Sequence, residues 1–255
     1  MIKKTFLVPI ILFVILMFGV NPAVGKMVTL VPQLVESETG ELIPDPDYWH
    51  VEGDVEFEDS DFDGRVEQMS ITGTNSSTSG VPFNSAGLYL NWSRNRDIDI
   101  SYVSGSIMIP DNYADYAYDD SLGITLQKMT DKNLDIQARI VWYAHQEKLA
   151  AQIFIIDSNN GGIPDEIGEA VYVDAEPGEF YDIVVQHRGN TVLLFVGDQL
   201  IRTWVFSKKQ YGNVIFSGAY FWGFSYCDTF SCGSPGQPIG TVRDMVVRFK
   251  EWGSR

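Results

Sequence analysis

The chain has 255 residues, 45% of them hydrophobic, and a formal net charge of −16 at pH 7. A surface this acidic repels phosphate backbones and anionic lipid head groups, which argues against binding to nucleic acid or to a membrane surface. The length is sufficient for one large domain with a sizeable core.

The first 25 residues have the pattern of a secretory signal. Two lysines precede an apolar run over residues 6–20, and small residues end the segment ahead of Lys26. The alternative is an uncleaved membrane anchor, but the run is shorter than the roughly 20 apolar residues of a spanning helix. We therefore expect removal of residues 1–25, a formal charge of −18 for the remainder, and a secreted or cell-surface protein with no membrane contact.

Short segments with alternating apolar and polar residues make up most of the remaining chain. Residues 26–46 contain three prolines and are expected to form an extended lead-in. From residue 47 to residue 255 the pattern predicts strands separated by turn residues such as Gly189-Asn190, without a sustained helical period. The predicted strands lie within residues 49–58, 65–73, 86–92, 97–110, 122–127, 134–144, 149–157, 169–174, 180–188, 191–206, 213–226 and 242–252. Many short strands without helices predict a single antiparallel β-sandwich or barrel domain over residues 47–255.

Residues 59–70 read like the first half of a calcium loop. Alternate carboxylates precede Gly64, which permits a sharp turn, but position 12 of the loop is Ser70 instead of a bidentate glutamate. The candidate ligands of a structural Ca²⁺ are Asp59, Asp61, Asp63 and Glu67. The alternative is an acidic hairpin with an Asp-Gly turn and solvated carboxylates. A weaker candidate, residues 157–166, resembles a degenerate thrombospondin type-3 calcium repeat, although a loop between strands explains it better.

The two cysteines of the chain, Cys227 and Cys232, lie close together in the segment CDTFSC. Outside the cell, two neighbouring thiols most simply form a disulfide. The loop that they would close is short, so such a bond would remove little entropy from the unfolded chain. We predict a local disulfide that staples this loop.

Residues 180–204, FYDIVVQHRGNTVLLFVGDQLIRTW, resemble the signature hairpin of concanavalin A-like jelly rolls, which include laminin-G and lectin/glucanase sandwiches. Residues 195–198, FVGD, occupy the turn motif of that hairpin, with glycine and aspartate swapped relative to the commoner order. Residues 48–66 resemble the opening hairpin of such domains, and residues 242–250 resemble their closing strand. The resemblance implies a two-sheet jelly roll, an architecture that serves sugar binding, hydrolysis and adhesion alike.

The sequence offers little for catalysis. Asp97 and Asp99 partly match the ExDxxE strand of family-16 laminarinase-like hydrolases, but Ser101 stands near the place of the last acid. Retaining glycosidases need two carboxyl groups about 5–5.5 Å apart, which this segment does not specify. The histidines occur in unrelated strands, without a nucleophile elbow, and we expect each at the surface or at a strand end: His50, His145 and His187. We predict no catalytic residue.

Aromatic side chains provide the best candidates for sugar contacts. One face of the segment YFWGFSY is expected to be core, namely Tyr220, Trp222, Phe224 and Tyr226. Sugar rings stack on exposed aromatic planes near loop ends, and the candidates there are Trp92, Tyr113, Tyr116, Tyr118, Trp142, Tyr143 and Trp204. The leading hypothesis is a secreted, non-catalytic protein that binds a carbohydrate or glycoconjugate. The alternatives are a glycoside hydrolase or lyase of the same fold, and a structural or adhesive surface protein.

Overall fold

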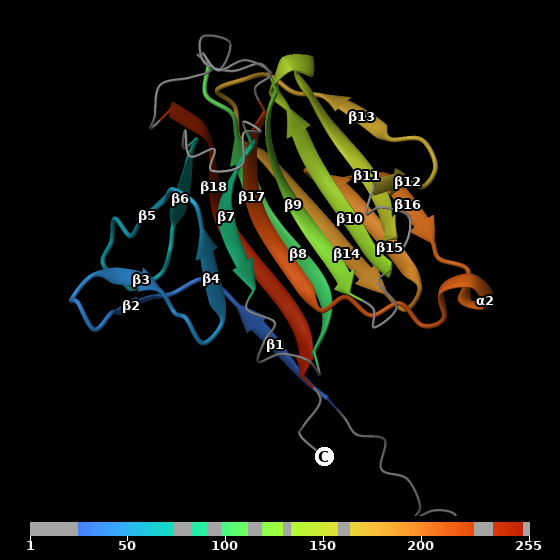
Figure 1. Cartoon of the computed structure of the whole chain (residues 1–255), viewed down its shortest axis with the longest axis horizontal. Coiled ribbons are helices and arrows are strands. Elements are labelled where there is room, and N and C mark those ends of the chain that lie inside the picture. Colours follow the sequence, from blue (N-terminus) through green and yellow to red (C-terminus); the bar gives the residue numbers. More distant parts are fainter. Residues whose placement is uncertain are drawn as a thin grey trace, which may run out of the picture.

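The computed structural model describes residues 25–73, 83–90, 98–111, 119–129, 134–157, 164–226 and 237–251. These residues form two stacked antiparallel sheets and a small separate hairpin (Figure 1). Helix is confined to the 3-10 turn η2 (Ala144–Gln146) and the short α2 (Lys208–Tyr211) within the described ranges. The all-β, two-sheet sandwich predicted from the sequence is therefore confirmed.

Eight strands form each sheet, and the first sheet contains both the closing strand and the signature hairpin. In spatial order, the first sheet consists of β16 (Gln199–Val205), β15 (Thr191–Val196), β14 (Tyr181–Arg188), β8 (Ile98–Met108), β18 (Gln237–Glu251), β6 (Gln68–Gly73) and β5 (Val55–Glu58), and β1 (Lys26–Leu30) also pairs with β18. The second sheet consists of β12 (Pro164–Glu166), β11 (Lys148–Asp157), β10 (Leu134–Tyr143), β9 (Asp119–Met129), β17 (Gly218–Tyr226), β7 (Phe83–Leu90) and β4 (Trp49–Glu52), and β13 (Val171–Asp174) also pairs with β11.

The signature hairpin forms the consecutive strands β14, β15 and β16, as the sequence predicts. Ile183 and Val185 on one face of β14 are fully buried, whereas Asp182 on the other face is exposed. Gly197 of the turn motif has a φ of 55°, a backbone conformation that favours glycine. Period-two burial along β14 is the pattern of a strand that covers a sandwich core.

The segment before residue 47 is more ordered than an extended lead-in. Strand β1 pairs with the closing strand, with Lys26 opposite Glu251. Strands β2 (Leu34–Glu36) and β3 (Leu42–Pro44) form a hairpin that projects beside β4 and β5 (Figure 1). The predicted opening hairpin also differs, because β4 joins the second sheet and β5 joins the first, where it pairs with β6.

The core lies between the sheets, and strand β17 faces it with the side opposite to the one predicted. Phe221 is fully buried in the core cluster, together with Ala219. A Cβ atom built on Gly223 would lie 3.0 Å from Cγ2 of Ile71 and 3.2 Å from Cγ2 of Ile239. Side chains of the first sheet fill this space, so the strand turns its small residues and Phe221 inward. The prediction of a core face containing Tyr220 and Trp222 was wrong, and these side chains lie on the outer face of the second sheet.

Among the described residues, no helix is long and apolar enough to cross a bilayer.

Candidate functional site

The outer face of the second sheet gathers polar and aromatic side chains from four adjacent strands. On β9, β10, β11 and β17, these side chains alternate with those that fill the core. The face includes Thr125, Gln127, Asp135, Gln137, Arg139, Tyr143, Gln152, Phe154, Tyr220 and Trp222. Several of these side chains are buried within the face, whereas those of Arg139, Tyr143 and Trp222 are partly exposed.

Arg139 is the centre of a hydrogen-bonded network on this face. Thr125 on β9 and Gln152 on β11 are its cross-strand neighbours. The Nε of Arg139 donates to Oε1 of Gln152 (3.2 Å), and the hydroxyl of Tyr143 donates to the same oxygen (2.9 Å). The guanidinium carbon lies 4.1 Å from the centroid of the Phe154 ring. The network fixes the guanidinium plane against an aromatic face, a favourable arrangement for a cation.

Trp222 lies beside this network with glycines on both sides. Its Cα partners on the neighbouring strands are Gly87 and Gly123, so no side chain flanks the indole within its cross-strand row. A Cβ atom on Gly87 would lie 2.3 Å from the carbonyl oxygen of Phe221, which leaves no room for a larger residue. The indole Nε1 donates to Oγ1 of Thr125 (2.8 Å). The ring is thus held in place and remains partly exposed.

Asp135, on the same face, has a carboxyl group whose pKa is shifted. Burial raises the pKa of its carboxyl from 3.8 to about 6, against the opposing effect of hydrogen bonds from Gln127 and Gln137. Its Oδ2 accepts a hydrogen bond from Nε2 of Gln127. A carboxyl that titrates near pH 6 can be protonated or charged under ordinary conditions.

This shift makes the stability of the fold depend on pH. Because the folded-state pKa of Asp135 is raised, its stabilising contribution is complete below about pH 3.8 and is lost as the pH rises through about 6. Asp135→Asn should therefore match the wild type at pH 4 and be more stable at pH 7 by about 1–2 kcal/mol, after allowance for solvent screening. Urea unfolding at both pH values checks this, and an equal difference at pH 4 and pH 7 would contradict it.

The structure separates the predicted sugar contacts. Trp142 is fully buried and packs edge-on against Tyr181, with ring centroids 5.2 Å apart, which corrects its assignment to the surface. Tyr143, the next residue, lies on the outer face of the second sheet. Trp204 is half-buried on β16, an edge strand of the first sheet, with Arg202 over its ring. The other four, Trp92, Tyr113, Tyr116 and Tyr118, lie outside the described residues.

Apart from Tyr143, sequence reasoning missed the residues that make up the network, although β10 carries a usable signal. Its even positions from 136 to 142 are all apolar, whereas its odd positions include Asp135, Gln137 and Arg139. Period two therefore assigns Trp142 to the core and Arg139 to the outer face. Trp222 had no such signal, because both faces of β17 carry large aromatic residues.

The acidic loop between β5 and β6 brings three of its predicted ligands together. Carboxylate oxygens of Asp59, Asp61 and Asp63 all lie within 4.8 Å of one another, a group that could hold a metal ion. The loop is closed by its own carboxylates, because Oδ2 of Asp59 accepts the backbone N–H of Gly64 (2.9 Å). Glu67 is not part of the group and accepts hydrogen bonds from Ser60 instead.

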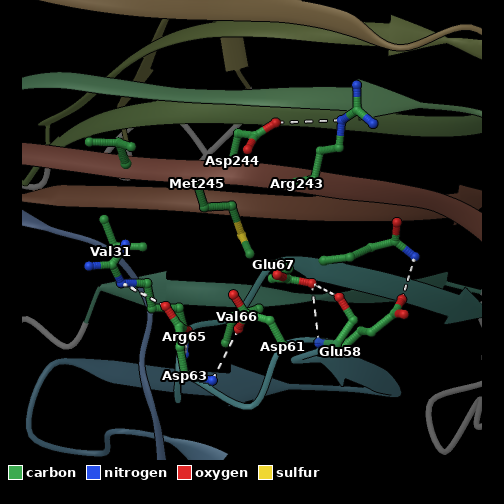
Figure 2. A pocket seen from close by; sticks show the side chains of 13 residues that line it. Val31, Glu58, Asp61, Asp63, Arg65, Val66, Glu67, Arg243, Asp244 and Met245 are labelled. Carbon is green, nitrogen blue, oxygen red and sulfur yellow. Dashed lines mark hydrogen bonds and ion pairs between the residues drawn. The ribbon is translucent and has the colours of Figure 1, made fainter.

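A surface pocket opens between this loop and the closing strand β18. Figure 2 shows Asp61 and Asp63 on one side of the pocket and the Arg243–Asp244 ion pair on the other. Arg65 pairs with Asp63 at 3.5 Å, which partly neutralises the loop. The site is therefore acidic but is already engaged in hydrogen bonds and an ion pair.

The remaining predictions for chemistry fall elsewhere. Asp99 lies on β8 in the first sheet, where its Oδ1 is 3.5 Å from Nδ1 of His187, and Asp97 lies outside the described ranges. His187 is buried at 4% exposure, so it ends its strand as expected but not at the surface. Cys227 and Cys232, and most of the loop within residues 157–166, also lie outside the described residues.

Solved structures of similar fold include glucanases and a carrageenase. A β-1,3-1,4-glucanase (lichenase) derived from a mouse hindgut metagenome has a TM-score of 0.56 at 8% identity, over 88% of this chain and 98% of its own. A non-specific endo-β-1,3(4)-glucanase from family GH16 has a TM-score of 0.55 at 12% identity, over 90% and 92%. The κ-carrageenase from Pseudoalteromonas carrageenovora, solved with an oligotetrasaccharide, has a TM-score of 0.54 at 9% identity, over 92% and 98%.

No family model matches the chain, and no curated protein sequence matches it. The structural similarity at such low identity establishes the fold, which is the concanavalin A-like jelly-roll sandwich that the signature hairpin predicts.

Proposed function

We propose that the protein is exported and binds a carbohydrate on the outer face of the second sheet. The observation that supports this most directly is the partly exposed indole of Trp222 beside the hydrogen-bonded group of Arg139, Tyr143 and Gln152. A sugar ring presents an apolar C–H face and a rim of hydroxyls. An aromatic plane next to fixed polar groups matches both features.

The structural neighbours support the ligand class, because they include glucanases and a carrageenase. This is an argument by analogy of fold. Carbohydrate binding on this face does not require the aromatic contacts predicted for the loops, since the outer face supplies its own aromatic and polar groups.

A glycoside hydrolase is the second candidate, and one observation favours it. The pKa of Asp135 is raised to about 6, a value suited to a general acid. However, a glycosidase of the usual kind needs a second carboxyl group facing the first across the sugar bond. Within the described part of this face, the side-chain hydrogen bonds of Asp135 come from the amides of Gln127 and Gln137. We therefore place binding ahead of hydrolysis.

Affinity electrophoresis of the exported protein in gels with different polysaccharides tests this proposal. We expect retardation by at least one polysaccharide, without release of reducing sugar from it. Release of reducing sugar that Asp135→Asn abolishes would replace the binding function with hydrolysis. Unaltered migration across a broad panel of neutral and charged polysaccharides would refute a carbohydrate ligand.

We further propose that the group of Asp59, Asp61 and Asp63 takes up Ca²⁺ as a structural ion. Ligand binding to the folded state alone stabilises it, so millimolar Ca²⁺ should raise the melting temperature by about 2–4 °C. Asp61→Asn should remove most of this gain, because the amide still accepts the loop hydrogen bond but lacks the charge. Differential scanning calorimetry with Ca²⁺ and with chelator checks this. Asp198→Asn, at an exposed turn, is the matched control and should keep the gain.

A further inference from the structure

We propose that the bound carbohydrate is anionic, and that Arg139 recognises its carboxylate or sulfate group. This inference rests on the proposed function, since it names the ligand class of the same face. It follows from the surroundings of Arg139, a partly buried guanidinium with uncharged hydrogen-bond partners among the described residues.

Arg139 has no carboxylate partner within ion-pair distance in the described part of the chain. Its hydrogen bonds go to uncharged groups, the amide oxygen of Gln152 and the hydroxyl of Tyr143. Glu166, an acid whose charge acts on Arg139, lies 3.9 Å from Nη1 of Arg202 and pairs with that residue. Burial lowers the pKa of the Arg139 guanidinium, which shows that its charge is desolvated without full compensation.

Other arginines of this acidic chain do find acids. Arg65 pairs with Asp63 at 3.5 Å, and Arg243 pairs with Asp244 at 3.5 Å. The chain has 34 aspartates and glutamates against 18 lysines and arginines, so carboxylates are plentiful. A partly buried cation without an ionic partner is costly, because desolvation is not offset by attraction to a counter-charge. A ligand that brings an anion to Arg139 would supply this counter-charge.

The geometry suits a sugar with a charged substituent. The guanidinium carbon lies 5.8 Å from the Trp222 ring centroid, so a saccharide stacked on the indole would have its substituents within reach of Arg139. No hydrogen bond to the described residues occupies Nη1 of Arg139, and Nη1 together with Nη2 can approach an anion in a forked arrangement. The negative net charge of the protein does not prevent this contact, because salt at 0.15 M screens charges beyond about 8 Å.

The test uses pairs of polysaccharides that differ only in charge. One pair is polygalacturonate and its fully methyl-esterified form, and the other is a sulfated galactan and the same galactan after desulfation. Isothermal titration at 0.15 M salt should give at least about tenfold tighter binding for one charged member than for its neutral counterpart, the size of a charge-assisted hydrogen bond. The pair that shows the preference tells whether the anion is a carboxylate or a sulfate.

Variants then assign the preference to a residue. Arg139→Gln should lose the preference for the charged member over its neutral counterpart, and Arg139→Lys should keep part of that preference. Arg248→Gln is the matched control, because Arg248 also lies over an aromatic ring, that of Tyr102, but on the exposed face of the first sheet. It should retain the full preference.

Three results would count against the inference. Equal binding of charged and neutral members by the wild type overturns it and leaves carbohydrate binding intact. So does a preference that persists in a folded Arg139→Gln variant. If neither pair binds but another neutral polysaccharide does, the ligand is not anionic, whereas failure of all polysaccharides refutes the proposed function itself. Thermal unfolding of each variant verifies that it is folded. The comparison of charged and neutral polysaccharides is made with the wild-type protein and does not depend on the folding of any variant.

Discussion

Phe221→Ala should lower the free energy of unfolding by about 3–5 kcal/mol, the usual cost of removing a fully buried phenylalanine. The Phe221 side chain is completely buried between the sheets, and its ring centroid lies 6.3 Å from that of Trp49. The truncation leaves a cavity that the surrounding strands of a sandwich cannot readily close. Urea unfolding followed by tryptophan fluorescence and circular dichroism measures the loss.

The adjacent residue provides the control for this experiment. Trp222→Ala removes a larger side chain from the opposite face of the same strand, where it is partly exposed, and should cost less than about 2 kcal/mol. If Trp222→Ala proved the more damaging of the two, strand β17 would face the core with its other side, and the proposed binding surface would disappear.

Trp222→Ala should instead weaken carbohydrate binding by about 30-fold or more, since tryptophans at the centre of a binding surface typically contribute 2 kcal/mol or more. The indole lies among Arg139, Thr125 and two glycines, so its removal would take away the aromatic plane and leave the polar groups without it. Titration of the polysaccharide identified by affinity electrophoresis measures the effect.

Trp204→Ala is the matched substitution for this second prediction. Trp204 is also half-buried beside an arginine, but it lies on the edge strand β16 of the other sheet. We expect its affinity to remain within about threefold of the wild type. A loss as large as that of Trp222→Ala would move the binding site to the sandwich edge.

The architecture was predictable because the period-two pattern is local. On β14, each alternate position from Ile183 onward is apolar until His187, and the strand is buried at those positions. The paired strands of the signature hairpin follow each other directly, so their pairing needs no distant information. The exchange of β4 and β5 between sheets was not predictable in this way. It depends on the partner of each strand, because β5 pairs with β6, the next strand in the chain, whereas β4 pairs with the more distant β7.

The candidate site was harder to predict from the sequence, for a related reason. On β17 both faces carry large aromatic residues, and the choice of the inward face is made by Ile71 and Ile239 from the opposite sheet. On β10 the local pattern is sufficient, because Trp142 lies in the apolar register of Ile140 and is buried. The prediction of a surface position for Trp142 was wrong because it was based on the position of this residue near the end of the strand. Contacts between strands far apart in sequence thus decide which face of a strand packs in the core and which face lies outside.

The pairing of β1 with β18 has a practical consequence for engineering. Lys26 and Glu251 stand opposite each other in an antiparallel ladder, a separation of about 5 Å between Cα atoms. Attachment of the protein to a solid support ahead of residue 26 or after residue 251 would therefore anchor the sandwich at nearly the same point. For the same reason, a linker of only a few residues would suffice for head-to-tail cyclisation or circular permutation.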